Sequence, residues 1–171
     1  MLPNGFVSEV RQVGLVVRDL EATLESYTNQ VGIGPWRVSL LAPPGLSDMR
    51  IRGESVDYSM KVAVAWTGNT MWELIEPVDG PSIYKEFLDH HGEGIHHLLV
   101  HHHGLDFDTA LERFSERGCP PLMEGRLGDI RFAYVESEGP LKTTLEIVHR
   151  PPGSEPLTPD YWYPAKPEEA G

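Results

Sequence analysis

Cysteine is almost absent from this chain, because Cys119 is the only one among 171 residues. A lone cysteine excludes an intrachain disulfide framework. Basic residues are also scarce, with 14 lysines and arginines against 26 acidic residues and a formal net charge of −12. This balance argues against nucleic-acid binding, which needs a basic surface. It also disfavours binding to an anionic membrane surface.

Long apolar runs are missing as well. No stretch approaches the roughly 18 consecutive apolar residues of a membrane span. Residues 1–10 lack the basic and apolar regions of a signal peptide. We therefore expect a cytoplasmic protein without a membrane segment. The chain length and the 40% share of hydrophobic residues suit a single domain with a substantial core over residues 1–171.

Two segments of the chain share one pattern. Residues 11–32, RQVGLVVRDLEATLESYTNQVG, and residues 96–118, HHLLVHHHGLDFDTALERFSERG, each place a polar residue before an apolar run. An aspartate, Asp19 or Asp106, then precedes apolar residues at i, i+4 and i+7, which lie on one helix face. Aspartate is a good helix N-cap, and a glycine near each helix end is a typical stop signal. The chain thus contains a repeated strand–helix unit.

The repeat continues beyond the helices. NTMWELIEP at 69–77 and KTTLEIVHRP at 142–151 both read as short strands that close at a proline and carry a glutamate between apolar residues, Glu73 or Glu146. Each half has room for two more strands, for which the candidates are residues 36–43, 58–66, 120–125 and 130–137. Each half therefore reads β-α-β-β-β. Paired units of this kind can place their helices outside and curl their sheets around a shared cleft.

This pattern predicts an α+β fold made of two paired βαβββ modules, with a curved, open-barrel sheet around a central cleft. Module 1 covers about residues 8–80 and module 2 about residues 93–151. Residues 152–171 form a tail rich in proline, which we expect to drape over the surface or to be disordered. Its YWY segment suits packing over the cleft or against a second subunit.

Five of the eight histidines lie in residues 92–104, GEGIHHLLVHHHG. The apolar LLV centre indicates a strand, in which His97 and His101 would lie about 13 Å apart at ~3.3 Å per residue. That distance is too long for one metal ion to bind both. Side-chain alternation would also place His96 on the face opposite His97. The segment therefore predicts one useful metal ligand, His97, and a solvated strand end at residues 101–103.

Glu73 and Glu146 stand out because each lies within an apolar strand, at matched positions of the repeat. A buried carboxylate is costly without a partner, and a bound cation would satisfy both. Gln12 and His97 open the first strand of the two halves, also at matched positions. These four residues are therefore candidates for a single metal site.

Together these features resemble the vicinal oxygen chelate superfamily, which includes glyoxalase I, methylmalonyl-CoA epimerase, extradiol dioxygenases and bleomycin-resistance proteins. The resemblance covers about residues 8–151 and rests on the paired modules and on VGLVVRDLEATLESY, GEGIHHLLV and LEIVHRP. GIGPW at 32–36 and EFLDHHGEGIHH at 86–97 point to the methylmalonyl-CoA epimerase-like branch. In this superfamily the metal ligands come from the first and last strands of each module. The resemblance implies the ligands Gln12, Glu73, His97 and Glu146.

One histidine, two carboxylates and one amide suit a divalent Lewis acid such as Zn²⁺, Co²⁺, Ni²⁺, Mn²⁺ or Fe²⁺. Iron centres that activate oxygen typically use two histidines and one carboxylate, so a dioxygenase is disfavoured. A Lewis acid that chelates adjacent oxygens makes the neighbouring C–H acidic and stabilises an enolate, and a carboxylate can move the proton. We predict a metal-dependent epimerase, racemase or isomerase that acts on a small carbonyl substrate, with Glu73 and Glu146 as catalytic residues.

Two alternative functions remain open. A glyoxalase I-like lyase shares the Gln-Glu-His-Glu ligand set of the eukaryotic type. A metal-free small-molecule binding or resistance protein on the same fold would explain why glutamine replaces the histidine that the family often has at residue 12. Metal content separates the binding protein from the two enzymes, and glutathione dependence separates the lyase from the isomerase.

Some expectations concern the surroundings of the site. Trp36 is a candidate for the substrate wall. The resemblance to methylmalonyl-CoA epimerase implies a further carboxylate on a middle strand as the opposing acid or base, and Glu54 and Asp57 lie in that region without matching it cleanly. Coenzyme A phosphates need basic contacts, so a CoA thioester is mildly disfavoured because the cleft strands offer only one basic cluster: Arg50, Arg52 and Lys61. Paired modules of this superfamily often dimerise, so we expect a homodimer.

Overall fold

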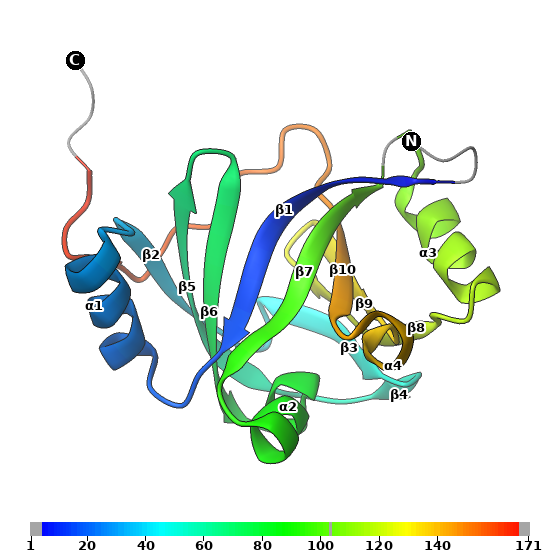
Figure 1. Cartoon of the computed structure of the whole chain (residues 1–171), viewed down its shortest axis with the longest axis horizontal. Helices are drawn as coiled ribbons and strands as arrows, with labels where there is room; N and C mark the ends of the chain where they lie inside the picture. Colours follow the sequence, from blue (N-terminus) through cyan, green and yellow to red (C-terminus); the bar gives the residue numbers. More distant parts are fainter. Residues whose placement is uncertain (1–4, 103, 168–171) are drawn as a thin grey trace.

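The computed structural model describes residues 5–102 and 104–167. Figure 1 shows one strongly curved sheet with helices arranged around it. The strands are β1 (Val7–Val16), β2 (Trp36–Leu41), β3 (Leu46–Ile51), β4 (Glu54–Ser55), β5 (Ser59–Thr67), β6 (Thr70–Asp79), β7 (Gly94–His102), β8 (Pro121–Leu127), β9 (Ile130–Val135), β10 (Thr144–His149) and β11 (Tyr161–Tyr163). The helices are α1 (Leu20–Val31), α2 (Ile83–His91), α3 (Phe107–Glu116) and α4 (Glu138–Leu141).

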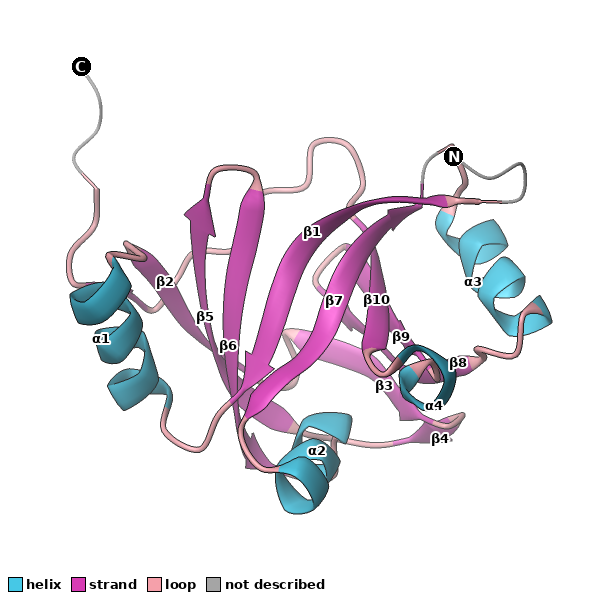
Figure 2. Cartoon of the chain, in the orientation of Figure 1, coloured by secondary structure: helices cyan, strands magenta, loops and turns pink. Residues whose placement is uncertain are grey.

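The strands of the described chain form a single sheet in the order β11-β2-β5-β6-β1-β7-β10-β9-β8-β3-β4. β1 is parallel to β6, β7 is parallel to β10, and the central pair β1 and β7 is antiparallel. Each half therefore contains the predicted β-α-β-β-β order, and the two halves meet at the central pair. The predicted α+β fold with a curved, unclosed sheet is confirmed (Figure 2).

Strands β3 and β4 were not predicted, and they connect the two halves. They follow β2 in the sequence, but β3 pairs with β8 near the opposite edge of the sheet. The link at residues 42–45 thus carries the chain from one half to the other. This pairing joins residues far apart in sequence, so no local pattern could reveal it.

Helices α1 and α3 cover the outer face of the sheet, whereas α2 packs against residues of its inner face. α1 packs on β5 and β6, α3 packs on β9 and β10, and α2 lies against β1, β6 and β7. Asp19 accepts a hydrogen bond from the N–H of Ala22 at 2.9 Å, and Asp106 accepts one from Thr109 at 2.9 Å. Both predicted N-caps are therefore confirmed. No helix among the described residues has the length and apolarity needed to cross a membrane.

The C-terminal tail is tied to the sheet. β11 pairs with β2 and becomes an edge strand. The N–H of Asp160 donates to the Val38 carbonyl at 2.8 Å, and its carboxylate accepts from the N–H of Leu40 at 2.7 Å. After β10 the chain therefore returns to the first half of the sheet, where the expectation was a surface-draped or disordered extension. His103 and the tail residues 168–171 lie outside the described residues.

Candidate active site

Gly14 makes room for the centre of the site. It lies on β1 opposite Glu73 of β6 on one side and opposite His97 of β7 on the other. A Cβ at residue 14 would overlap the imidazole of His97. The ring therefore occupies the space that a side chain on β1 would fill, and it crosses β1 to reach Glu73. This close approach requires glycine.

A second row of residues crosses the same strands two residues further along. Gln12 of β1 pairs with Leu99 of β7, and Leu99 pairs with Glu146 of β10. Both rows lie on one face because side chains in a strand alternate. Glu73 lies next to β1, and Glu146 lies next to β7 in the equivalent position. The two halves therefore contribute equivalent glutamates, as the repeat indicates.

Three of the four predicted site residues converge on Nε2 of the fourth, His97. His97 Nε2 lies 3.3 Å from Glu73 Oε2, 3.4 Å from Glu146 Oε2 and 3.1 Å from Gln12 Nε2. The Gln12 amide also donates to Glu73 Oε2 at 2.6 Å. His97 is fully buried and Gln12 and Glu146 nearly so, whereas the Glu73 side chain keeps 16% of its surface exposed. The site is thus a largely buried cluster of two carboxylates, an imidazole and an amide.

The donor set fits a divalent cation. Glu146 Oε2 is buried and has no hydrogen-bond partner, which leaves a lone pair for a cation. The 3.3 and 3.4 Å separations are those of neighbouring ligands around an ion with bonds of about 2.0 to 2.2 Å. The Gln12 amide turns its nitrogen inward, and a flip of the amide would present its oxygen. Among the described residues, Glu73, His97 and Glu146 do not form a group whose ligand atoms all lie within 4.8 Å of one another, so the two carboxylates lie farther from each other than each lies from His97 Nε2.

A tighter acidic group lies elsewhere, and local structure accounts for it. Ligand atoms of Asp19, Glu21 and Glu76 all lie within 4.8 Å of one another. Asp19 caps α1, Glu76 accepts from the N–H of Leu20 at 2.8 Å, and Lys61 bridges Glu21 and Glu76 at 3.3 Å each. The N-terminus of α1 and Lys61 therefore balance the negative charge of this surface group.

His96 lies beside His97, contrary to the expected alternation. Gly14 pairs with His97 and Leu15 pairs with Ile95, which leaves His96 as the extra residue of a β-bulge. Its Nδ1 lies 3.0 Å from Nδ1 of His97. If His97 Nε2 binds a cation, His97 Nδ1 carries the hydrogen and donates it to His96. The histidine doublet is visible in the sequence, but the bulge that turns both rings inward is not.

Burial dominates the protonation of the site. It raises the pKa of Glu146 to about 8, with a further contribution from Glu73, against the opposing effects of His97 and the Tyr134 hydroxyl. Burial alone would lower the pKa of His97, but the contacts with Glu73 and Glu146 raise it above its ordinary value. The site therefore retains protons that the same groups would release in water.

Three buried tyrosines lie next to this cluster. The hydroxyl of Tyr84 donates to that of Tyr134 at 2.8 Å, and Tyr134 pairs with Glu146 across β9 and β10. Tyr58 is also buried, and its hydroxyl has no hydrogen-bond partner. Burial raises the pKa of all three, so they stay neutral. Sequence reasoning missed them because a tyrosine among apolar residues is an ordinary core residue.

A cavity of about 480 Å³ extends over the inner face of the sheet from this site. Gln12, Glu73 and Glu146 lie in its wall, together with Tyr84 and Tyr134. Most other wall residues are apolar, among them Met60, Val62, Leu127, Ile130 and Phe132. Glu73 and Glu146 therefore lie at the wall of a largely apolar cavity that can hold a small molecule.

Several predicted neighbours of the site lie outside this wall. Trp36 is fully buried and donates its indole N–H to the Ile33 carbonyl at 2.9 Å, so it is a core residue and the prediction of a substrate contact is wrong. Glu54 and Asp57 are exposed and do not line the cavity, so the structure does not place either of them as an opposing acid or base.

The basic residues of the cavity also differ from those predicted. Arg52 pairs with Glu86 and Lys61 with Glu21 and Glu76, and neither they nor Arg50 line the cavity. The arginines in its wall are instead Arg37 and Arg150. The prediction that a CoA thioester is disfavoured was therefore based on basic residues that do not line the cavity.

Solved structures share this fold. Methylmalonyl-CoA epimerase from Mycobacterium tuberculosis is 21% identical with a TM-score of 0.61, over 89% of this chain and 94% of that chain. A methylmalonyl-CoA epimerase in complex with methylmalonyl-CoA and NH4+ is 21% identical with a TM-score of 0.58, over 88% and 99%. A hypothetical protein from Bacillus halodurans is 19% identical with a TM-score of 0.62, over 86% and 98%.

Sequence comparison adds the family. No curated protein sequence matches the chain. A family model described as the glyoxalase/bleomycin resistance protein/dioxygenase superfamily matches residues 11–134, which is most of the chain. The matched range includes Gln12, Glu73 and His97 and ends before Glu146. The match, the paired βαβββ modules and the curved, unclosed sheet together show that the chain belongs to the glyoxalase/bleomycin resistance protein/dioxygenase superfamily.

Proposed function

We propose that the protein is a metal-dependent isomerase, of the epimerase or racemase type, that moves a proton at a carbon next to a carbonyl group. The observation that carries this proposal is the convergence of two glutamates and a glutamine on His97 Nε2 at the wall of an apolar cavity. Similar solved structures include methylmalonyl-CoA epimerases, and epimerisation is a proton transfer of this kind.

Gln12, Glu73, His97 and Glu146 would hold one divalent cation, which can be Zn²⁺, Co²⁺, Ni²⁺, Mn²⁺ or Fe²⁺. When bound, the cation supplies a Lewis acid that polarises the substrate carbonyl and makes the neighbouring C–H more acidic. Burial limits the contact of the two carboxylates with solvent, which strengthens their electrostatic interactions. His96 holds the ring of His97 through the contact between the two Nδ1 atoms.

The proton moves between the substrate and the two glutamates. A carboxylate accepts the proton, and the electron pair of the broken C–H bond moves toward the carbonyl oxygen. Return of the proton to the other face of the carbon inverts its configuration. Within the described part of the chain Glu73 and Glu146 are the acidic residues in the cavity wall, so we assign both the removal and the return of the proton to them.

A metal-free binding protein is the second candidate. The Gln12 amide already bonds Glu73 and contacts His97, so these groups partly satisfy one another without an ion. The apolar cavity would then serve only to hold a ligand. A glyoxalase I-like lyase would use the same four residues and would require glutathione.

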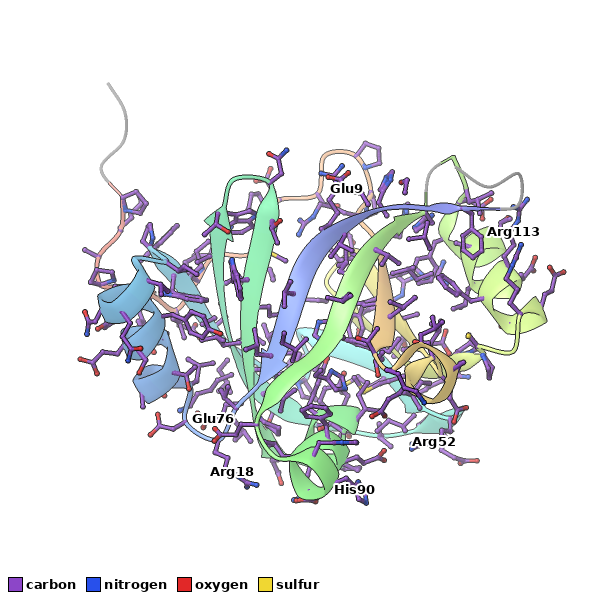
Figure 3. The ribbon with its side chains drawn as sticks, viewed as in Figure 1. Glu9, Arg18, Arg52, Glu76, His90 and Arg113 are labelled. Carbon is purple, nitrogen blue, oxygen red and sulfur yellow. The ribbon has the colours of Figure 1, made fainter. Side chains whose placement is uncertain are left out.

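Metal content is the first test. The untagged protein, its His97→Ala and Glu146→Ala variants and a His90→Ala control would be analysed by inductively coupled plasma mass spectrometry. His90 is a matched control because it lies on the outer surface of α2 (Figure 3). We expect close to one metal equivalent in the wild type and the control and little in the site variants. No metal, even after dialysis against Zn²⁺, Co²⁺ and Mn²⁺, would favour the binding protein.

Proton exchange is the second test. Carbonyl compounds would be incubated with the loaded protein in D2O and followed by NMR for loss of the proton next to the carbonyl. We expect exchange that Glu73→Gln and Glu146→Gln each reduce by at least a hundredfold. Exchange that needs added glutathione would point to the lyase.

The oligomeric state of the protein and its location in the cell remain predictions. We expect a homodimer in the cytoplasm, and analytical ultracentrifugation over a range of protein concentrations tests the association. A mass of 19.1 kDa at all concentrations would identify a monomer.

A further inference from the structure

Two arginines lie in the cavity wall at a distance from the glutamates. Arg37 pairs with Val64, and Val64 pairs with Glu73, so Arg37 lies two strands from Glu73, or about 10 Å at ~4.8 Å per strand. Arg150 follows Glu146 by four residues along the chain, or about 13 Å at ~3.3 Å per residue. The cavity therefore has an acidic end and cationic groups roughly 10 to 13 Å from it.

Neither arginine has an acidic partner in the described part of the chain. Other arginines do, and these are Arg11, Arg52, Arg126 and Arg131. Arg37 donates one Nη2–H to the Leu157 carbonyl, and its Nε is buried without a hydrogen-bond partner. The chain has 26 acidic residues against 14 basic ones, yet no carboxylate of the described residues forms a salt bridge with either arginine. Arg37 lies against the Trp162 ring, and Arg150 is exposed where it lines the cavity. An anionic ligand group would supply an acceptor for the buried Arg37 Nε and a counter-charge for both arginines.

The space between the two ends suits an apolar molecule. Met60, Val62 and Phe132 lie in the wall, and Leu157 and Pro156 of the tail line it as well. A cavity of about 480 Å³ falls within the range that encloses a small organic ligand. The tail is anchored to β2 through Asp160 and β11, so this part of the wall is a fixed feature of the fold.

We infer that the ligand of this cavity is a small apolar carbonyl compound that carries a carboxylate or phosphate group at the end remote from the reacting carbon, bound by Arg37 and Arg150. The position of the reacting carbon rests on the proposed function. The binding of the anionic end does not, because it involves neither the glutamates nor a metal ion.

Matched eight-carbon probes test the charge preference. Octanoate, octyl phosphate, 1-octanol and octylamine share one apolar body, which when extended spans about the distance between the two ends. Isothermal titration calorimetry would be done on the metal-free protein in EDTA. We expect octanoate or octyl phosphate to bind about ten- to a hundredfold more tightly than 1-octanol, which corresponds to one charge-assisted hydrogen bond. Equal binding of the anions and the alcohol, or tighter binding of the amine, would overturn the inference.

Single substitutions locate the anionic end. Arg150→Gln and Arg37→Gln should each remove most of the anion preference and leave the affinity for 1-octanol unchanged. Arg113→Gln is the matched control, because Arg113 lies on α3 at the outer side of the molecule (Figure 3). Arg37 also contacts the tail through Leu157, so Arg150→Gln is the cleaner test. An anion preference that survives in both cavity variants contradicts the inference.

Binding of octanoyl-CoA and comparison with the metal content distinguish failure of this inference from failure of the proposed isomerase. Octanoyl-CoA carries its phosphates on a large carrier, and we expect it to bind no more tightly than octanoate. Tighter binding would assign the anionic group to a carrier thioester and overturn the assignment to a small acid. If metal binds but the anion preference is absent, this inference fails alone, whereas an anion preference without any metal binding contradicts the proposed isomerase alone.

Discussion

Single residues set the geometry of the site as much as the four predicted side chains do. Gly14 leaves the space that the His97 ring fills, and His96 contacts the ring nitrogen that faces away from the carboxylates. Neither residue supplies a ligand in the proposal. Both decide where the imidazole lies, so each can be tested without removing a candidate ligand.

Gly14→Ala should displace the His97 ring, because the added Cβ overlaps the imidazole. We expect metal binding to be lost and the free energy of unfolding to fall by about 1–3 kcal/mol, as for other overpacked sites. Urea unfolding and metal titration measure the two effects. Gly139→Ala is the control, since a Cβ there meets nothing within 4 Å. Wild-type metal affinity in Gly14→Ala would show that the ring position is not needed.

His96→Phe should weaken metal binding while it preserves packing. The His96 ring contacts Tyr84 and Phe87 edge to face, and phenylalanine can keep these contacts. It removes the Nδ1 that faces His97, so we expect about ten- to a hundredfold weaker metal affinity. Competition with a chelator of known affinity measures this change. Equal affinities in His96→Phe and in a surface control, His90→Phe, would exclude a positioning role.

At the scale of elements, the two halves are joined by more than the central strands. β3 crosses from the first half to pair with β8, and the tail returns from β10 to pair with β2. Residues of both connections line the cavity, among them Leu46 and Leu157. The cavity wall therefore depends on segments that lie outside the βαβββ repeat.

Asp160→Ala should release the tail from the sheet. Its carboxylate is the acceptor for the N–H of Leu40, so we expect faster hydrogen exchange in β2 and β11 and a loss of about 1 kcal/mol in global stability. Hydrogen-exchange mass spectrometry resolves the two regions. Glu155→Ala removes a charge from the same tail at an exposed residue and is the control. Unchanged exchange in Asp160→Ala would mean that backbone pairing alone holds the tail.

For the whole molecule, the buried carboxyl group of Glu146 makes the free energy of unfolding depend on pH. The pKa of Glu146 is about 8 in the folded protein against 4.5 for an ordinary glutamate, so the folded state keeps a proton that the unfolded chain releases. This contribution to stability is complete below about pH 4.5 and is lost as the pH rises toward 8. The raised pKa of His97 acts in the same direction.

Glu146→Gln imitates the protonated side chain at every pH. In the metal-free protein we expect the stability of this variant to rise relative to the wild type by about 1–3 kcal/mol between pH 5 and pH 8. Urea unfolding at several pH values measures the difference. Glu155→Gln, at an exposed site, should give a curve parallel to the wild type. Parallel curves for Glu146→Gln would show that Glu146 does not hold its proton in the folded state.

Local and repeated patterns were enough to predict the modules and the candidate residues. Asp19 and Asp106 cap the predicted helices, and Glu73 and Glu146 occupy equivalent positions beside the central strands. A buried glutamate in an apolar strand is recognisable from sequence because burial without a partner is costly. The roles of these residues as ligands and bases remain predictions.

By itself the sequence determined the strand and helix periods, the helix caps and the twofold repeat, because these depend on residues close together in the chain. Only the tertiary structure decided the bulge at His96, the crossing of β3 to β8 and the two arginines in the cavity wall. These features arise where strands distant in sequence pair and curve around a common space. Register and curvature are set by the sum of many packing contacts, so a single segment carries no signal of them.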